Sequence, residues 1–212
     1  IAGGLNLVSY GTEDGLYING RITDNSPYLT FEWKAGKDGE VHQVRTQLIG
    51  EYNFPNALAA ITIGRFFGVE AQQIDEALAE YTPQNNRSQL KKTEDNTLII
   101  DAYNANPTSM MAALQNFRNM TVPHKMLLLG DMRELGAESA AEHQKIVDYI
   151  KENGFEKVWL VGEQFAAAQH SFKTYANVQE VIKELETNKP KGYTILIKGS
   201  NGIKLSSTVE HL

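Results

Sequence analysis

The sequence contains no cysteine, has no excess of positive charge and has no long apolar run. Without thiols the chain forms no disulfide, thiolate metal site or thiol nucleophile, as is typical of proteins in a reducing compartment. A formal net charge of −6 argues against nucleic acid or anionic lipid as the main partner, because both select for basic surfaces. No segment approaches the roughly 18 apolar residues of a membrane span. We therefore predict a cytoplasmic protein with no membrane span and no nucleic-acid partner.

Several motifs of catalysis and ligand binding are also missing. The sequence has no G-x-x-x-x-G-K-[ST] phosphate loop, no G-x-G-x-x-G after a strand and no G-x-S-x-G elbow. The five histidines lack metal-ligand spacing, and His143 on an apolar helix face is predicted to be a hydrogen-bonded core residue. We predict no metal site and no catalytic residue within these 212 residues.

The chain begins "IAGGLNLVSYG" without methionine, as though it started inside a domain, so we expect a fragment of a longer protein. Its length and its hydrophobic content of 42% favour two small cores over one large core. The turn-rich stretch "TPQNNRSQ" is predicted to link a unit at 1–84 to a unit at 85–212.

Residues 1–84 are predicted to form short strands followed by two helices. In "YLTFEWK" apolar and polar residues alternate, which indicates a half-buried strand, and "EVHQVRTQLIG" is predicted to be another. Helical spacing predicts two apolar faces, and the aromatic residues of "RFFG" are expected in the core. The first face comprises Ala59, Ile63, Phe66 and Phe67, and the second comprises Ile74, Ala77, Leu78 and Tyr81.

From about residue 88 aliphatic strands alternate with amphipathic helices, whose predicted apolar faces include Leu114, Val147 and Val181. "TLIID", "HKMLLLGD", "KVWLVG", "FKTY" and "YTILIKG" are the predicted strands. This order predicts an α/β fold with a doubly wound, mostly parallel, Rossmann-like sheet and helices on both faces. Ligands of such sheets bind beyond the carboxyl ends of the strands.

Polar turns follow three of these strands: "DAYNANP" from Asp101, "GDMRELG" at 130–136 and "KGSNG" at 198–202. Carboxylates, amides, a lysine and glycine-exposed N–H groups there suit a ligand with hydroxyl or phosphate groups. The alternative is purely structural, because Asn, Asp, Ser and Thr also cap helices. Both roles can coexist in one turn: Thr108 or Ser109 is expected to cap the helix after Pro107 while Asp101 and Asn104 face the crevice.

The segments "GEYNFPNALAAITIGRFFGV", "NNRSQ", "DAYNANPTSM", "LGDMRELG" and "KGS" occur in an order and spacing that closely resemble the Mur ligases. "YNANP" and "GDMRELG" resemble the members that add D-alanyl-D-alanine. The resemblance implies that 1–84 is the end of a central ATPase domain and that 85–212 is a carboxyl-terminal domain closing over ATP. It also implies that the phosphate loop and the Mg²⁺ ligands lie upstream of Ile1.

The resemblance implies an ATP-dependent ligase that joins D-alanyl-D-alanine to UDP-N-acetylmuramoyl-tripeptide for the cell wall. The tripeptide carboxylate is phosphorylated, and the dipeptide amine attacks the acyl phosphate. Such an intermediate hydrolyses in water, so a closing domain must exclude water while it orients the amine. This chain alone is expected to be inactive.

Carried over by motif, Asn53 and Asn56 would lie near the adenine, although both also suit helix capping at Pro55. Arg87 would reach the nucleotide from the interdomain segment. Asp101 would accept hydrogen bonds from the ribose hydroxyls. Tyr103, Asn104 and Asn106 would line the same crevice, with Asn104 the most direct contact.

Weaker correspondences place Asp131, Glu134, Lys198, Gly199 and Ser200 toward the dipeptide or the closed interface. Asn201 departs from the family pattern, which has an arginine there, and its role is left unassigned.

Two alternatives remain at this point. Another amide-forming ligase of the superfamily, such as another Mur ligase or a folylpolyglutamate synthetase, would use a different acceptor. A receiver-like signalling module would also place Asp101, Asp131 and Lys198 at strand ends. Such a module needs an acidic pair after its first strand, but Ala102 follows Asp101 here, and "WLVG" ends without an Asp.

Overall fold

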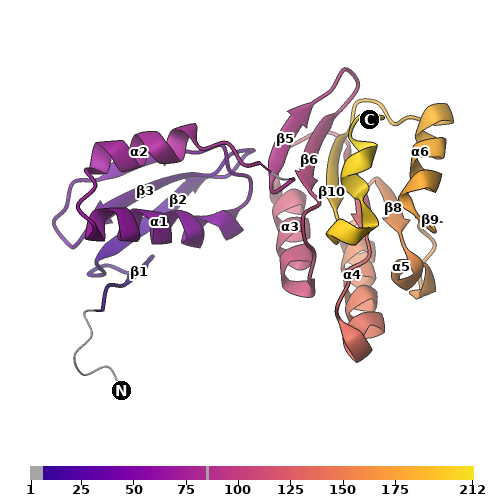
Figure 1. Cartoon of the computed structure of the whole chain (residues 1–212), viewed down its shortest axis with the longest axis horizontal. Helices are drawn as coiled ribbons and strands as arrows, with labels where there is room; N and C mark the ends of the chain where they lie inside the picture. Colours follow the sequence, from indigo (N-terminus) through magenta and orange to yellow (C-terminus); the bar gives the residue numbers. More distant parts are fainter. Residues whose placement is uncertain (1–6, 85) are drawn as a thin grey trace. The chain divides into compact units, whose positions relative to one another are not determined.

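A computed structural model describes residues 7–84 and 86–212. The chain divides into two compact units, Ile1–Thr82 and Pro83–Leu212, so the division lies two residues before the predicted one. Each unit has its own hydrophobic core. Figure 1 shows the helices and strands of each unit. No described helix is long and apolar enough to cross a membrane.

The first unit is a small sheet with two helices. Its strands are β1 (Tyr10–Gly11), β2 (Ile18–Asp24), β3 (Thr30–Ala35) and β4 (His42–Arg45), in that spatial order. The pairs β2–β3 and β3–β4 are antiparallel, and η1 (Glu51–Asn53), α1 (Phe54–Phe66) and α2 (Ala71–Glu80) follow. Phe31 and Trp33 are buried beneath the helices, which confirms the alternation predicted for "YLTFEWK".

The predicted core face of α1 is wrong. Phe54, Ala57, Leu58 and Ile61 face the sheet instead. Ile63 is 60% exposed, Phe66 50% and Phe67 78%. The helix is apolar around most of its circumference, so spacing alone does not select one stripe. In α2, Ile74 is buried as predicted, whereas Tyr81 lies beyond the helix end and is exposed.

The second unit is built on a six-stranded sheet. Its strands are β5 (Gln89–Lys92), β6 (Thr97–Asp101), β7 (Lys125–Gly130), β8 (Lys157–Val161), β9 (Lys173–Tyr175) and β10 (Thr194–Lys198). The spatial order is β5-β6-β10-β7-β8-β9, and all neighbouring pairs are parallel except β5–β6. The predicted mostly parallel sheet is confirmed, and the antiparallel edge strand β5 was not predicted.

Helices cover both faces of this sheet (Figure 1). One face carries α3 (Pro107–Asn119), α4 (Ser139–Asn153) and α5 (Glu163–Ala167), which contact one another in sequence. The other carries α6 (Val178–Thr187) and η4 (Leu205–Thr208), which share a core with alternate strand residues such as Leu128 and Ile197. Two short turns, η2 (Gly136–Glu138) and η3 (Asn201–Ile203), lie at the carboxyl edge of the sheet. The apolar faces predicted for α3, α4 and α6 are buried in this way.

Candidate functional site

The three predicted polar turns meet at one edge of the sheet, because β10 lies between β6 and β7. Ser200 connects them. Its Oγ accepts a hydrogen bond from the Arg133 N–H at 2.8 Å and donates one to the Ala105 carbonyl at 3.4 Å. Its own N–H donates to the Asp131 carbonyl at 3.2 Å. Ser200, predicted to face a ligand, is therefore a buried link between the turns.

Asp101 and Lys198 form an ion pair at this edge. They are register partners at the ends of β6 and β10, and the Lys198 Nζ lies 2.6 Å from the Asp101 Oδ2. The same ammonium donates to the Asn104 carbonyl at 3.3 Å. Lys198 is only 1% exposed. Its ammonium is therefore engaged by residues of the site itself, and its predicted role toward the dipeptide or the closed interface stays a prediction.

Arg87 and Tyr103 lie together in the second unit. The guanidinium carbon of Arg87 is 3.9 Å from the centroid of the Tyr103 ring, within the range of a cation–π contact. Both side chains are exposed, and Tyr103 precedes the exposed Asn104. The structure thus brings Arg87 to the turn that follows Asp101, although Arg87 precedes Asp101 by 14 positions in the sequence.

Asn53 and Asn56 belong to the first unit. Asn53 occupies the N-cap position of α1, but its side chain donates to the Ile49 carbonyl at 2.9 Å and caps no helical N–H. Asn56 is exposed within the first turn of α1, beyond the capping position. Side-chain capping of α1 is therefore the wrong explanation for this pair, and contact with adenine stays a prediction.

Asn106 does cap a helix. Its Oδ1 accepts the Ser109 N–H at 2.8 Å, and the Ser109 Oγ accepts the Asn106 N–H at 3.1 Å, which together form a capping box for α3. Of the two residues expected to cap this helix, Ser109 takes part as the third helical residue of the box, whereas Thr108 does not and Asn106 is the N-cap residue. For Asn106, the observed role is therefore helix capping, the alternative to ligand binding that the sequence left open.

Asp131 holds the start of α5. Its Oδ1 accepts the Phe165 N–H and its Oδ2 accepts the Gln164 N–H, each at 2.9 Å. His143 lies behind it with no exposed surface, accepting the Met132 N–H on Nε2 at 3.0 Å. The Nδ1 of His143 is 2.7 Å from the Ser139 carbonyl and donates to it. The prediction of a hydrogen-bonded core histidine is confirmed, and Asp131 has a structural role whatever it binds.

Gly199 is explained by close packing. A Cβ at this position would lie 2.9 Å from the Cα of Gly130, closer than real Cβ atoms approach a backbone. The chain after β10 therefore approaches the end of β7 this closely because residue 199 is glycine, whereas a Cβ at Gly130 would meet the side chains of Ile203 and Leu205.

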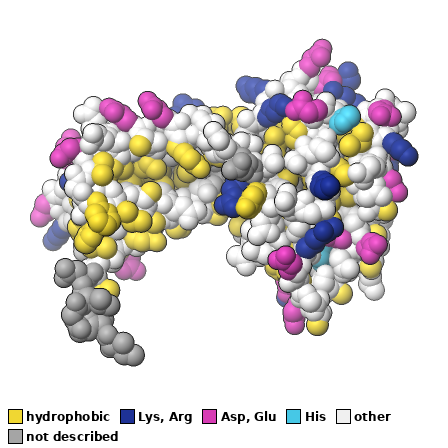
Figure 2. All heavy atoms as spheres, viewed as in Figure 1, with side chains coloured by type: hydrophobic (Ala, Val, Ile, Leu, Met, Phe, Trp, Pro, Cys, Tyr) yellow, Lys and Arg dark blue, Asp and Glu magenta, His cyan; other side chains and the backbone are white. Residues whose placement is uncertain are grey.

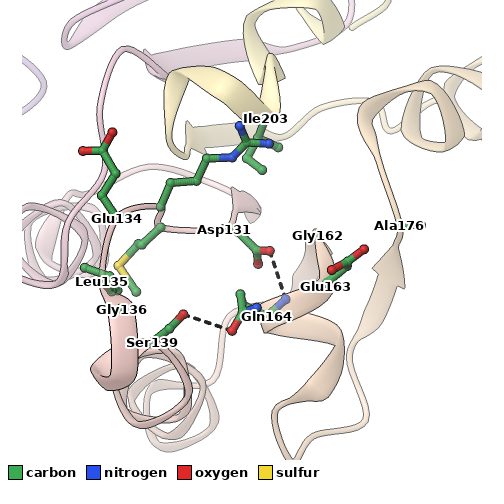
Figure 3. A pocket seen from close by; sticks show the side chains of 12 residues that line it. Asp131, Glu134, Leu135, Gly136, Ser139, Gly162, Glu163, Gln164, Ala176 and Ile203 are labelled. Atoms are coloured by element: carbon green, nitrogen blue, oxygen red, sulfur yellow. Dashed lines mark hydrogen bonds between the residues drawn. The ribbon is translucent and has the colours of Figure 1, made fainter.

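A cavity of about 680 Å³ opens beyond β7, β8 and β9 (Figure 3). The residues lining it include one cation, two exposed carboxylates, a hydroxyl and an amide: Arg133, Glu134, Glu163, Ser139 and Gln164. The Ser139 hydroxyl donates to the Gln164 Oε1 at 3.0 Å, across the cavity wall.

Of these residues, only Glu134 was predicted. Arg133 lies in the quoted motif "GDMRELG" but was not singled out. The strand-end rule applied to "WLVG" would have found Glu163 and Gln164, which follow β8 directly. Among the residues described, no group of three or more His, Asp or Glu is placed to hold a metal ion.

The family model, the curated relatives and the solved structures that match this chain agree with one another. The family model for "Mur ligase, glutamate ligase domain" matches residues 86–201. The UDP-N-acetylmuramoyl-tripeptide–D-alanyl-D-alanine ligase of Bacillus subtilis is 34% identical over 176 residues, covering 78% of this chain and 38% of the relative. The enzyme of that name from Escherichia coli is 33% identical over 204 residues, and the match covers 92% of this chain and 43% of the relative.

A crystal structure of MurF from Acinetobacter baumannii superposes with a TM-score of 0.80 at 26% identity, covering 96% of this chain and 46% of that one. The MurF ligase of Thermotoga maritima, solved in complex with ADP, shares the fold at 18% identity with a TM-score of 0.77. The match covers 95% of this chain and 47% of that one. The chain therefore spans less than half the length of these relatives.

Proposed function

The chain belongs to the Mur ligase family, and we propose that it acts as the carboxyl-terminal part of an ATP-dependent ligase. This ligase joins D-alanyl-D-alanine to UDP-N-acetylmuramoyl-tripeptide in the cytoplasm, for peptidoglycan synthesis. Support comes from the curated relatives named for this reaction, which match 78% and 92% of the chain. Family membership also removes the receiver-module alternative.

The edge formed by β6 and β10 fits a nucleotide. Asp101 offers a carboxylate to ribose hydroxyls, and Arg87 offers an always-charged fork to a hydroxyl or phosphate oxygen. The exposed Asn104 side chain adds an amide beside them. In the first unit, Asn53 and Asn56 are proposed to contact adenine. ADP bound to the Thermotoga relative supports this class of ligand, and Mg²⁺ would be held by residues outside this chain.

The cavity beyond β7 and β8 fits the dipeptide. A dipeptide carries a carboxylate at one end and an amine at the other, and the residues that line the cavity include Arg133, with its guanidinium, and the acidic residues Glu134 and Glu163. The Arg133 guanidinium forms no ion pair with any residue the structure describes, so it is available to a ligand carboxylate. Charge complementarity is the single observation that carries this assignment.

The reaction requires an oriented amine and little water. An acyl phosphate is attacked either by the dipeptide amine or by water, so the product depends on which nucleophile is held in line. Holding the dipeptide carboxylate on Arg133 would fix one end of this nucleophile. Closure of the domain that carries the cavity would then exclude competing water.

The test is acceptor-dependent phosphate release by the full-length ligase that contains this chain. We expect release from ATP only when both UDP-N-acetylmuramoyl-tripeptide and D-alanyl-D-alanine are present. Single amino acids and folate with glutamate serve as matched acceptor controls. Release that depends on one of these acceptors would overturn the proposed acceptor and indicate another ligase of the superfamily.

A further inference from the structure

We propose that Lys198 is a positioning residue that sets the geometry of the nucleotide-binding turn without touching the nucleotide. The inference rests on the proposed function, because it concerns the same site. Lys198 is a cation that is 1% exposed at the end of the central strand β10. A buried charge without a partner is strongly unfavourable, so the partners of this ammonium indicate its role.

Both observed partners of the ammonium belong to the turn. The Nζ donates to the Asp101 Oδ2 at 2.6 Å and to the Asn104 carbonyl at 3.3 Å. Two of its three N–H groups thus bridge a side chain at the start of the turn and a backbone carbonyl three residues later. This bridge closes the turn around residues 101–104.

The bridge leaves one carboxylate oxygen of Asp101 for a ligand. Lys198 binds Oδ2, and no described residue donates a hydrogen bond to Oδ1. Because Oδ2 is fixed, Oδ1 points in one direction and does not exchange with Oδ2 by rotation of the carboxylate. A carboxylate held in this way binds a ribose diol with less loss of side-chain entropy than a free one.

Asn104 is held by the same ammonium. With its carbonyl turned inward to Lys198, the exposed side chain of Asn104 is presented beside Tyr103 and its stacked partner Arg87. One buried cation therefore orients the carboxylate and the amide that the proposed function assigns to the nucleotide. A lysine that contacted substrate directly would need an exposed ammonium, and this one is buried.

The test is a double-mutant cycle in the full-length ligase. Lys198→Met removes the ammonium and keeps the stem, and Asp101→Asn removes the charge of its partner. We expect Lys198→Met to raise the KM for ATP about tenfold, with the KM for D-alanyl-D-alanine changed less than about twofold. In the Asp101→Asn background, Lys198→Met should have a smaller effect than in the parent, because the part of its role that passes through Asp101 is already lost and only the contact with the Asn104 carbonyl remains.

Lys198→Arg should recover part of the ATP affinity, since it restores a cation able to reach Asp101. Effects that multiply in the double variant, or a rise mainly in the KM for the dipeptide, would overturn the inference. The double variant buries no unpaired charge, so it reports on positioning even if Lys198→Met folds poorly. Circular dichroism and the unfolding midpoint of each variant check the fold.

Direct binding of ADP, measured by calorimetry, separates this inference from the proposed function. If the parent ligase binds ADP but uses another acceptor, the acceptor assignment fails. The double-mutant cycle is then evaluated from the dissociation constants for ADP of the parent and the three variants. If the parent binds ADP and Lys198→Met binds it equally well, the positioning role fails while the proposed function stands.

Discussion

Arg133 is the residue whose replacement tests the dipeptide cavity most directly. Because a charge-assisted hydrogen bond contributes about 1.5–3 kcal/mol, Arg133→Ala should raise the KM for D-alanyl-D-alanine at least tenfold. The KM for ATP should stay within about twofold, since Arg133 lies beyond β7 and not at the β6–β10 edge. Initial rates of phosphate release with each substrate varied in turn measure both constants.

Arg118→Ala is the matched control, because Arg118 is an exposed arginine in the last turn of α3. An unchanged dipeptide KM in Arg133→Ala, or an equal rise in Arg118→Ala, would remove Arg133 from the acceptor site.

For single residues, the sequence predicted the place in the sheet more successfully than the hydrogen-bond partners. Asp101 and Ser200 were expected at a common strand edge, and they lie there because β10 inserts between β6 and β7. Their partners could not be predicted, because they depend on the order of strands, which the periodicity of each strand does not encode. Lys198 is an example. A lysine at the end of an aliphatic strand predicts an exposed cation, whereas the structure buries this lysine against Asp101 of the neighbouring strand.

The short helix α5 depends on a carboxylate from another strand end. Asp131→Ala leaves the N–H groups of Gln164 and Phe165 without their acceptor, so we expect a loss of about 1–2 kcal/mol in the free energy of unfolding. Asp131→Asn should lose less, because one carbonyl oxygen remains. Urea unfolding of the chain measures both.

Asp148→Ala is the control for removing a carboxylate, because Asp148 is half-exposed on α4 and contacts only side chains there. If Asp131→Ala and Asp148→Ala have equal unfolding midpoints, α5 does not depend on this cap.

Whole elements were predicted more securely when one face was clearly apolar. In α3 and α4 the apolar residues occupy one stripe, and Leu114 and Val147 are buried as the spacing predicts. In α1 the apolar residues surround the helix, and spacing then favoured Phe66 over the true core residue Ile61. The yellow side chains over the first unit in Figure 2 show how much apolar surface this unit leaves uncovered.

At the scale of the whole chain, the two hydrophobic clusters predict separate responses to core mutation. Phe31→Ala in the first unit and Trp159→Ala in the second each remove a buried ring from the cluster of that unit and should cost about 3–5 kcal/mol. We expect faster amide hydrogen exchange only in the unit that carries the change, because no residue belongs to both clusters. Mass spectrometry of peptides from each unit measures this.

Phe67→Ala is the control, because Phe67 is 78% exposed and its loss should change stability by less than about 0.5 kcal/mol. Equal acceleration of exchange in both units after either core mutation would show that they unfold together.

The position of β10 determines when the second unit can finish folding during synthesis. It is the last strand in sequence order, yet it lies between β6 and β7, which were translated about 70 to 100 residues earlier. Until Thr194–Lys198 leaves the ribosome, the two earlier strands each have an unpaired edge in the middle of the future sheet. A nascent chain stopped before residue 194 is therefore open to pairing with other chains, and Thr194–Lys198 completes the sheet and the ligand edge together.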